Sequence, residues 1–268
     1  MRKIFFPLLL IIVSCSAPQP ELYEWRGSDR MGIYLDEDLL KEWPEEGPVE
    51  IWTIDSLGRG YGSPTFTENR CYLTGEVDSM AVLYCIDLEG NRMWQSNLGR
   101  EWVSTYPGSR SAPTIVDDLI YVGSGMGNLY CLEKATGNVV WSKDFAGEFQ
   151  GGLPRFGHSE SAAVDGEKVF WTPGGEKHNV VALDRFTGEL IWSNPGFGER
   201  SGYHPPRVIA PGDRKILVTF SAYHLMGLDV ETGEMIWSQE MDGMPVEKRK
   251  PGMGDTHANT VIFEDGAV

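Results

Sequence analysis

A hairpin pattern that recurs four times constrains the fold more than any other feature of the chain. In each copy an apolar run leads into an acidic residue, a short turn that contains glycine, and a tryptophan four residues after that glycine. The glycines are Gly90, Gly137, Gly188 and Gly233, and the tryptophans are Trp94, Trp141, Trp192 and Trp237. A further tryptophan, Trp52, comes earlier, on the apolar run 49–54. Successive tryptophans stand 42, 47, 51 and 45 residues apart, a period that indicates stacked repeats.

The residues of each copy favour two antiparallel strands joined by a tight turn. In the third copy, Asp184 and Thr187 carry oxygens that can accept hydrogen bonds from turn amides, and Gly188 tolerates a positive φ. The strand that follows carries the tryptophan, whose indole needs a large apolar surface and a partner for its N–H group. Two more short apolar runs precede each hairpin, so every repeat of about 46 residues predicts four strands.

A four-stranded unit of this kind cannot cover both of its faces alone. Units with this period bury those faces by packing radially, as the blades of a β-propeller do. We therefore expect an all-β fold of four-stranded antiparallel blades, with complete blades near 62–99, 111–145, 160–195 and 204–241. Residues 256–268 match the start of a fifth blade, and Trp52 marks a lone outer strand at 49–54.

The turn sequence Asp-x-x-Thr-Gly-x-x-x-Trp resembles the tryptophan-docking motif of quinoprotein-type propellers, whose PQQ-like repeats are named after pyrroloquinoline quinone. In that family the tryptophan packs between neighbouring blades. The segment 25–32, Trp-Arg-Gly-Ser-Asp-Arg-Met-Gly, is similar to the N-terminal segment of secreted members. The resemblance covers residues 25–268. It does not extend to WD40 repeats, because no aspartate follows the hairpin tryptophans.

The number of repeats predicts an open ring. The resemblance implies seven or eight blades, whereas this chain holds about 4.5. We therefore expect residues 25–268 to form a C-terminally truncated propeller domain. A five-bladed ring and a swapped dimer are the alternatives. An open ring would leave sheet edges and tryptophan-docking surfaces exposed, which favours aggregation.

The N-terminus predicts export and lipidation. Two cations precede the ten-residue apolar run 4–13, which is too short to cross a membrane and is typical of a signal peptide. Ile-Val-Ser-Cys15 resembles a bacterial lipobox, which implies removal of residues 1–14, acylation of Cys15 and a lipidated tether at 15–24. In such lipoproteins an aspartate after the cysteine would keep the protein from the outer membrane. Ser16 stands there instead, which implies sorting to the outer membrane with the domain facing the periplasm. An ordinary secretory signal with a chance cysteine is the alternative.

The charge balance limits the partners. The chain has 23 Lys and Arg against 39 Asp and Glu, a net charge of −16, so we expect no nucleic-acid partner. The expected partners are the membrane, through the lipid anchor, and an outer-membrane protein, a peptide or a glycan.

The resemblance also raises the question of quinone chemistry. In quinoprotein dehydrogenases the quinone lies between a tryptophan floor and a pair of adjacent cysteines, Glu, Asn and Asp hold calcium, and an Asp acts as base. The cysteines here are Cys15, Cys71, Cys85 and Cys131, so no two are adjacent, and no calcium-binding set is assignable. We expect no cofactor, no metal and no catalytic residue. PQQ and calcium belong to the alternative of a quinoprotein alcohol dehydrogenase.

Two of these cysteines form a possible disulfide. Cys71 and Cys85 flank a turn near Asp78, on what we expect to be adjacent antiparallel strands. Directly opposed cysteines would allow a disulfide in an oxidising compartment. The alternative, two small buried thiols, is favoured because Cys131 occupies the repeat position of Cys85.

The first residues of the innermost strands are the candidate ligand site, because in a propeller they ring the mouth of the central channel. Aligned repeats place Gly62, Ser111, Glu160, His204 and His257 at one level, directly after Tyr61, Arg110, Ser159, Tyr203 and Thr256. Glu160, His204 and His257 carry side chains that bind metals, and Arg110 suits an anionic group. A solvated polar rim is the alternative.

The leading hypothesis is a non-catalytic, lipid-anchored propeller that binds or scaffolds at the outer membrane. In class it is similar to the propeller lipoprotein of the outer-membrane β-barrel assembly machinery. The first alternative is a PQQ-dependent alcohol dehydrogenase. The second is a polysaccharide-binding propeller, for which Trp102, Tyr106 and Phe156 offer aromatic contacts. Propellers host unrelated functions, so the fold alone does not decide among these hypotheses.

Overall fold

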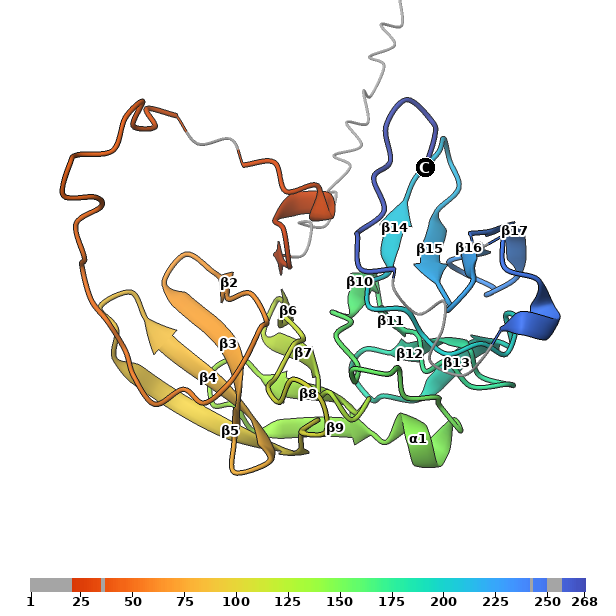
Figure 1. The fold of residues 1–268 in the computed structure, drawn as a ribbon, viewed down its shortest axis with the longest axis horizontal. Coiled ribbons are helices and arrows are strands. Elements are labelled where there is room, and N and C mark those ends of the chain that lie inside the picture. Colours follow the sequence, from red (N-terminus) through yellow and green to blue (C-terminus); the bar gives the residue numbers. More distant parts are fainter. Residues whose placement is uncertain (1–20, 35–36, 242, 250–256) are drawn as a thin grey trace, which may run out of the picture.

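Four antiparallel sheets arranged as an arc make up most of the molecule (Figure 1). The computed structural model describes residues 21–34, 37–241, 243–249 and 257–268. The predicted signal peptide, Cys15 and the first part of the predicted tether lie outside these described residues. The prediction of an all-β fold of four-stranded antiparallel blades is confirmed, and the arc of described residues does not close into a ring.

Each blade consists of four strands that pair in chain order. The first blade contains β2 (Thr65–Phe66), β3 (Arg70–Val77), β4 (Met80–Asp87) and β5 (Arg92–Arg100). The second contains β6 (Thr114–Val116), β7 (Leu119–Gly123), β8 (Leu129–Glu133) and β9 (Val139–Lys143). The third contains β10 (Ala163–Asp165), β11 (Lys168–Trp171), β12 (Val180–Asp184) and β13 (Leu190–Asn194). The fourth contains β14 (Arg207–Ile209), β15 (Ile216–Phe220), β16 (His224–Asp229) and β17 (Met235–Glu240).

The helices of the described residues are short. They are α1 (Phe145–Glu148) and the 3-10 turns η1 (Ser28–Arg30) and η2 (Val246–Lys248). None of the helices in the described ranges has the length and apolar character needed to cross a membrane.

The hydrophobic core lies between neighbouring blades. Leu83 of the first blade and Ile115 of the second belong to one buried cluster, and Phe170 of the third blade shares another with Leu217 of the fourth. The middle strands are therefore covered on both faces, which explains why they read as continuous apolar runs rather than as an alternation.

A tryptophan of one blade lies on a turn glycine of the next. A Cβ added to Gly233 would stand 2.5 Å from the Trp192 ring, so only glycine leaves room for the indole. Trp192 Nε1 donates to the carbonyl of Val230 in the same turn at 3.0 Å, which provides the buried N–H with a partner. The same contact joins Trp141 to Gly188 and Trp94 to Gly137.

The turn that presents this glycine is held by the aspartate before it. Asp229 Oδ1 accepts hydrogen bonds from the amides of Glu231 and Thr232 at 2.9–3.0 Å, and from the Thr232 hydroxyl at 3.1 Å. Gly233 then adopts a φ of +73°, as the sequence predicts for this position. Asp184 forms the corresponding bonds in the third blade.

Trp52 docks on the first blade without a strand of its own. Its Nε1 donates to the carbonyl of Leu88 at 2.8 Å, and its ring lies on Gly90. The predicted strand at 49–54 is wrong, because none of these residues is in a strand. A strand needs a neighbour for its backbone hydrogen bonds, and no described segment pairs with this run.

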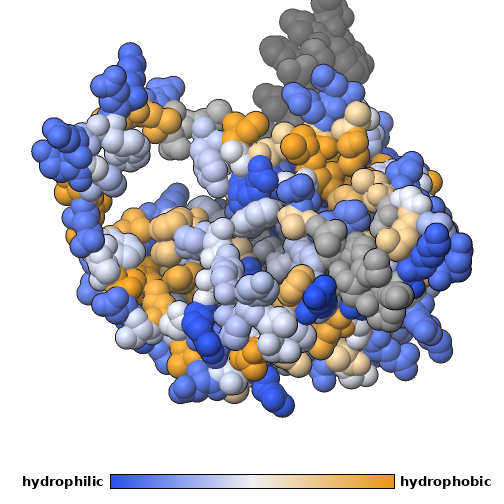
Figure 2. Space-filling model, in the orientation of Figure 1, coloured by the Kyte–Doolittle hydropathy of each residue, from blue (hydrophilic) through white to orange (hydrophobic). Residues whose placement is uncertain are grey.

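The two ends of the arc differ in how they are covered. Before the first blade, Leu39, Trp43 and Ile51 are 73%, 69% and 88% exposed on an outlying segment, where Figure 2 shows scattered hydrophobic residues. At the fourth blade, Val261 and Phe263 pack against the open hydrophobic face. The segment 257–268 therefore covers part of that face, although no strand forms in these residues.

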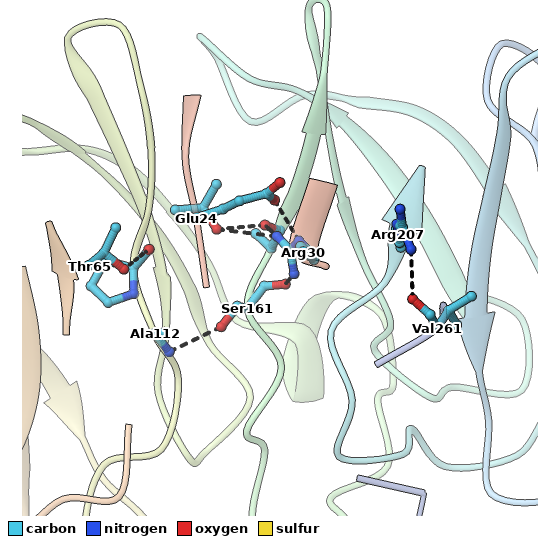
Figure 3. A network of polar contacts seen from close by, with 10 residues as sticks. Glu24, Arg30, Thr65, Ala112, Ser161, Arg207 and Val261 are labelled. Atoms are coloured by element: carbon cyan, nitrogen blue, oxygen red, sulfur yellow. Dashed lines mark hydrogen bonds and ion pairs between the residues drawn. The ribbon is translucent and has the colours of Figure 1, made fainter. Parts of the chain in front are cut away.

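The N-terminal segment lies against the second and third blades, and Figure 3 draws the contacts of its residues Glu24 and Arg30. β1 (Leu22–Tyr23) pairs with β6 as a fifth strand of the second blade, so the end of the segment assigned to the tether is part of the fold. Arg30 is 1% exposed; it donates to the carbonyl of Ser161 at 3.0 Å, to the carbonyl of Ala162, and to Glu24 at 2.5 Å. This arginine ties the N-terminal segment to the third blade.

The possible disulfide between Cys71 and Cys85 does not form. Strands β3 and β4 pair Cys71 with Ile86, and Tyr72 with Cys85, so the two cysteines are one register position apart. Side chains that differ by one position in a sheet point to opposite faces. Both cysteines are buried free thiols, as is Cys131, which agrees with the alternative of small buried thiols.

Candidate functional site

The residues just before the innermost strands lie together at one end of those strands, which we call the mouth. A cavity of about 200 Å³ lies there. Its lining residues are Trp25, Tyr61, Ser63, Arg110, Ala112, Ser159, Ser161, Tyr203, Pro205 and Ala258. Aromatic rings and hydroxyl groups therefore predominate on its walls, and Arg110 contributes the charge.

Ser111, Glu160 and His204 do not line this cavity, whereas Arg110, Ser159 and Tyr203, each one position earlier, do. The Ser111 hydroxyl accepts from the amide of Gly123 at 3.2 Å, and Glu160 accepts from the amide of Thr172 at 3.0 Å. His204 fills the same role in the fourth blade, where its Nε2 accepts from the amide of Phe220 at 3.1 Å. The residues on either side of this level line the cavity, whereas these three side chains bond to backbone amides of their blades.

Burial sets the protonation of two of these residues. Glu160 is 1% exposed, and loss of solvation raises its pKa well above the ordinary carboxyl value. His204 is also 1% exposed, and burial lowers its pKa to about 3, with a further effect from the neighbouring His257. Both groups are therefore favoured in their neutral forms, in which they serve as parts of the framework.

His257 is not placed with Glu160 around a common centre. Its ring stacks on Phe220 with the centroids 5.0 Å apart, and its carbonyl accepts from the amide of Tyr203 at 3.0 Å. Within the described ranges, no group of three His, Cys, Asp or Glu residues is arranged to hold a metal ion. The expected grouping of Glu160, His204 and His257 with Arg110 is thus corrected: of these four, only Arg110 lines the cavity.

Arg110 orders a loop at the mouth. Its guanidinium donates to the carbonyl of Gly108 at 2.5 Å, to that of Thr105 at 3.2 Å and to that of Tyr106, and it lies 5.4 Å from the centre of the Tyr61 ring. Burial lowers its pKa, while Glu101 acts in the opposite direction. The charge is therefore largely engaged by the protein's own backbone.

Glu101 is a framework residue that no motif identifies. It is 3% exposed and accepts from the amides of Trp102 and Gly125 at 2.6 Å and from the hydroxyl of Ser109 at 2.8 Å. Burial raises its pKa. It follows the last strand of the first blade, where the repeat supplies no signal for a buried carboxylate.

The aromatic residues considered for a polysaccharide surface gather beside the cavity. The rings of Tyr106 and Phe156 are 5.9 Å apart, and those of Phe156 and Tyr203 are 6.1 Å apart. The Tyr203 hydroxyl accepts from the amide of Phe156 at 3.1 Å, which fixes the ring pair. Trp102 Nε1 donates to the carbonyl of Thr105 at 3.0 Å, and Tyr106 remains 69% exposed.

The described residues do not fit a quinone with calcium. Cys85 and Cys131 lie in different blades and different core clusters, so they form no adjacent pair above a ring. The buried carboxylates Glu101 and Glu160 already accept backbone amides, and no described group of acidic ligands converges. The geometry of these residues supplies no cradle for the cofactor.

The sequence matches known proteins over much of its length. A family described as outer membrane protein assembly factor BamB, with PQQ-like repeats, matches residues 79–268. The BamB of Kangiella koreensis is 24% identical over 157 residues, covering 57% of this chain and 36% of that protein. The dehydrogenase subunit of the quinone alcohol dehydrogenase of Gluconobacter oxydans is 27% identical over 201 residues, covering 68% of this chain and 24% of that protein. The chain thus spans about a quarter to a third of the length of these relatives.

Solved structures share the fold. BamB from Moraxella catarrhalis superposes with a TM-score of 0.50 and 18% identity, covering 72% of this chain and 55% of that chain. The quinohemoprotein alcohol dehydrogenase ADHIIG of Pseudomonas putida gives a TM-score of 0.51 and 15% identity, covering 75% of this chain and 36% of that chain. Together with the docked tryptophan repeats, the match over 79–268 shows that the chain belongs to the PQQ-like repeat family of outer membrane protein assembly factor BamB.

Proposed function

We propose that this chain is the propeller of a bacterial cell-envelope protein that binds or scaffolds a partner without catalysis. Its family is described as outer membrane protein assembly factor BamB, which supports a role in the cell envelope. The observation that carries the non-catalytic part is how the channel uses its ionisable groups: Glu160 and His204 accept framework amides, and Arg110 donates to loop carbonyls. Side chains engaged in this way hold the fold instead of acting on a substrate.

The membrane attachment in this proposal rests on Cys15. Residues 1–14 are removed, Cys15 carries the lipid, and the domain faces the periplasm from the outer membrane. Cys15→Ser is expected to abolish incorporation of labelled palmitate and to move the protein from the membrane fraction to the soluble periplasm. Equal labelling of the variant would contradict the anchor while leaving the binding role open.

The partner surface in this proposal is the aromatic channel mouth. Tyr106 is well exposed there, and aromatic side chains with a polar rim are typical of contact surfaces. A photo-crosslinking amino acid at Tyr106 is expected to capture an envelope protein, a peptide or a glycan in cells. The matched control is Val140, which is 46% exposed on the outer strand β9. Equal capture at both positions would argue against a partner at the mouth.

A quinone test separates this proposal from its enzyme alternative. The similarity to quinone alcohol dehydrogenases favours that alternative. The purified full chain is mixed with pyrroloquinoline quinone and calcium, and quinone absorbance and dye reduction with ethanol are measured. We expect neither a bound quinone spectrum nor alcohol-dependent reduction. Stoichiometric quinone binding with turnover would overturn the scaffold role.

A polysaccharide ligand is the second alternative, favoured by the rings of Tyr106, Phe156 and Tyr203 at the mouth. Stacking on sugar faces would quench tryptophan or tyrosine fluorescence on titration with soluble glycans. Saturable quenching that is lost in Tyr106→Ala would favour the glycan over a protein partner.

A further inference from the structure

A second cavity lies at the opposite ends of the innermost strands from the aromatic mouth. Its volume is about 370 Å³, and β10, β14 and the N-terminal segment with η1 enclose it. The charged residues on its walls are Glu24, Asp29, Arg30, Asp165, Arg207 and Lys215. It adjoins the network drawn in Figure 3.

Most of these charges already have partners. Arg30 pairs with Glu24 at 2.5 Å, and Lys215 pairs with Asp165 at 2.6 Å. Asp29 is exposed to solvent. The cavity therefore has two neutralised ion pairs and one solvated carboxylate, which leaves Arg207 as the distinctive charge.

Arg207 is buried without a carboxylate partner. It is 6% exposed, and its Nη1 donates to the carbonyl of Val261 at 2.9 Å (Figure 3). Its Nε has no hydrogen-bond partner, and no carboxylate of the described residues forms an ion pair with it. Asp29 and Glu24 act on it electrostatically and raise its pKa, against the lowering caused by burial. A buried cation in this state is costly unless an anion neutralises it.

The rest of the cavity wall indicates what kind of anion fits. Val164, Val208, Ile209 and Phe263 present apolar surface beside Arg207. A guanidinium binds a carboxylate through two parallel hydrogen bonds, and the apolar surface suits a carbon chain. The volume falls within the range of small-molecule sites.

We propose that this cavity binds a small organic carboxylate with a short apolar body, and that Arg207 forms the ion pair with it. The N-terminal segment forms one wall, held in place by Arg30. This site is separate from the aromatic mouth and does not depend on the partner proposed there.

A series of fatty acids tests the proposal on the purified full chain. Apparent affinities for acetate, butyrate and hexanoate are obtained from the rise in the thermal unfolding midpoint with ligand concentration. We expect affinity to rise about fourfold per methylene until the apolar wall is covered. Hexanol and hexylamine, which lack the carboxylate, are expected to bind at least about tenfold more weakly than hexanoate.

Variants assign the site. Arg207→Gln is expected to weaken hexanoate binding by about tenfold or more, whereas Arg214→Gln, the matched control, leaves it unchanged. Arg214 is an exposed arginine that pairs with Asp229 on the outer part of the same blade. Arg207→Met removes a buried charge that lacks an ion pair, so the unliganded protein is expected to unfold at the wild-type temperature or above it.

Each result either supports or overturns the assignment. Crystals soaked in 6-bromohexanoate are expected to place the carboxylate on Arg207, a measurement that requires no variant. Hexanoate binding that survives in Arg207→Gln would overturn the site. Tight binding of inorganic phosphate, equal to that of hexanoate, would overturn the carboxylate in favour of a phosphoryl ligand. A lower unfolding temperature in unliganded Arg207→Met would assign Arg207 a purely structural role through Val261.

Discussion

The outer turns and the inner strand starts repeat with the same period but use their residues differently. At the outer turns, Asp184 and Asp229 make the same bonds, and both are followed by glycine at φ +73°. At the inner starts, a serine, a glutamate and a histidine perform one task, the acceptance of a framework amide. An indole on a glycine has one geometric solution, whereas any buried acceptor satisfies an amide. Residue type therefore predicts the local structure at the outer turns but does not predict it at the inner strand starts.

Removal of a docked tryptophan is expected to have the largest effect on stability, and it tests the packing at the outer turns. Trp192→Ala is expected to lower the free energy of unfolding by about 3–5 kcal/mol, because a buried indole and its hydrogen bond are lost together. Trp52→Ala, on a segment without a strand, is expected to cost about 1–2 kcal/mol. Urea unfolding measures both. Equal losses would mean that the Trp52 segment docks as firmly as a complete blade.

Substitution of a turn glycine is expected to have the next largest effect on stability. Gly233→Ala adds backbone strain at φ +73° and a Cβ 2.5 Å from Trp192, for a loss of about 2–5 kcal/mol. Gly212→Ala is the matched control, since Gly212 also has a φ of +73° but no atom within 4 Å of the added Cβ. Gly212→Ala therefore measures the backbone strain alone, which is expected to lower the free energy of unfolding by about 1–2 kcal/mol. If both variants unfold at the same urea concentration, the indole contact contributes nothing.

The buried His204 should make the stability of the protein depend on pH. Burial lowers the pKa of His204 to about 3, so between pH 6.5 and 3 only the unfolded chain takes up the proton, and stability falls as the pH falls. His204→Gln keeps an acceptor near the Nε2 position and is expected to flatten this decline. Circular dichroism melts at several pH values measure it, and an unchanged acid profile in the variant would contradict the assignment.

Glu160 should act in the opposite direction. Its pKa is raised in the folded state, so the stability it contributes is present below pH 4.5 and is lost as the pH rises through the folded value. Glu160→Gln should therefore stabilise the protein at pH 8 by about 1.4 kcal/mol for each unit of that shift, with little change at pH 4. Destabilisation at pH 8 would mean that the ionised carboxylate is held favourably.

The smallest expected effect is that of a reducing agent. Because Cys71 and Cys85 face opposite sides of the first blade, dithiothreitol should leave the unfolding midpoint unchanged. Burial also raises the pKa of Cys71 to about 11, so these thiols should react with a thiol reagent only on unfolding. A linked Cys71–Cys85 peptide in non-reducing mass mapping would contradict this.

Local chemistry explains which parts of the molecule could be predicted. The blades follow from Asp, Thr, Gly and Trp at fixed spacing, because each residue acts within its own turn or on the adjacent one. The repeat alignment groups Ser111, Glu160 and His204 but does not predict the direction of their side chains, since that direction depends on where strand pairing begins. Arg30 and Arg207 bond to backbone carbonyls far away in sequence, and carbonyls leave no residue signature.

The contact between Arg30 and the third blade also affects the order in which the chain folds. The carbonyl of Ser161 lies 131 residues downstream, so the N-terminal segment is synthesised early but completes its contacts late. At a synthesis rate of about 5–20 residues per second, that delay is about 7–26 s. During this time the N-terminal strand β1 can already pair with β6 of the second blade, but Arg30 has no carbonyl of the third blade to bind.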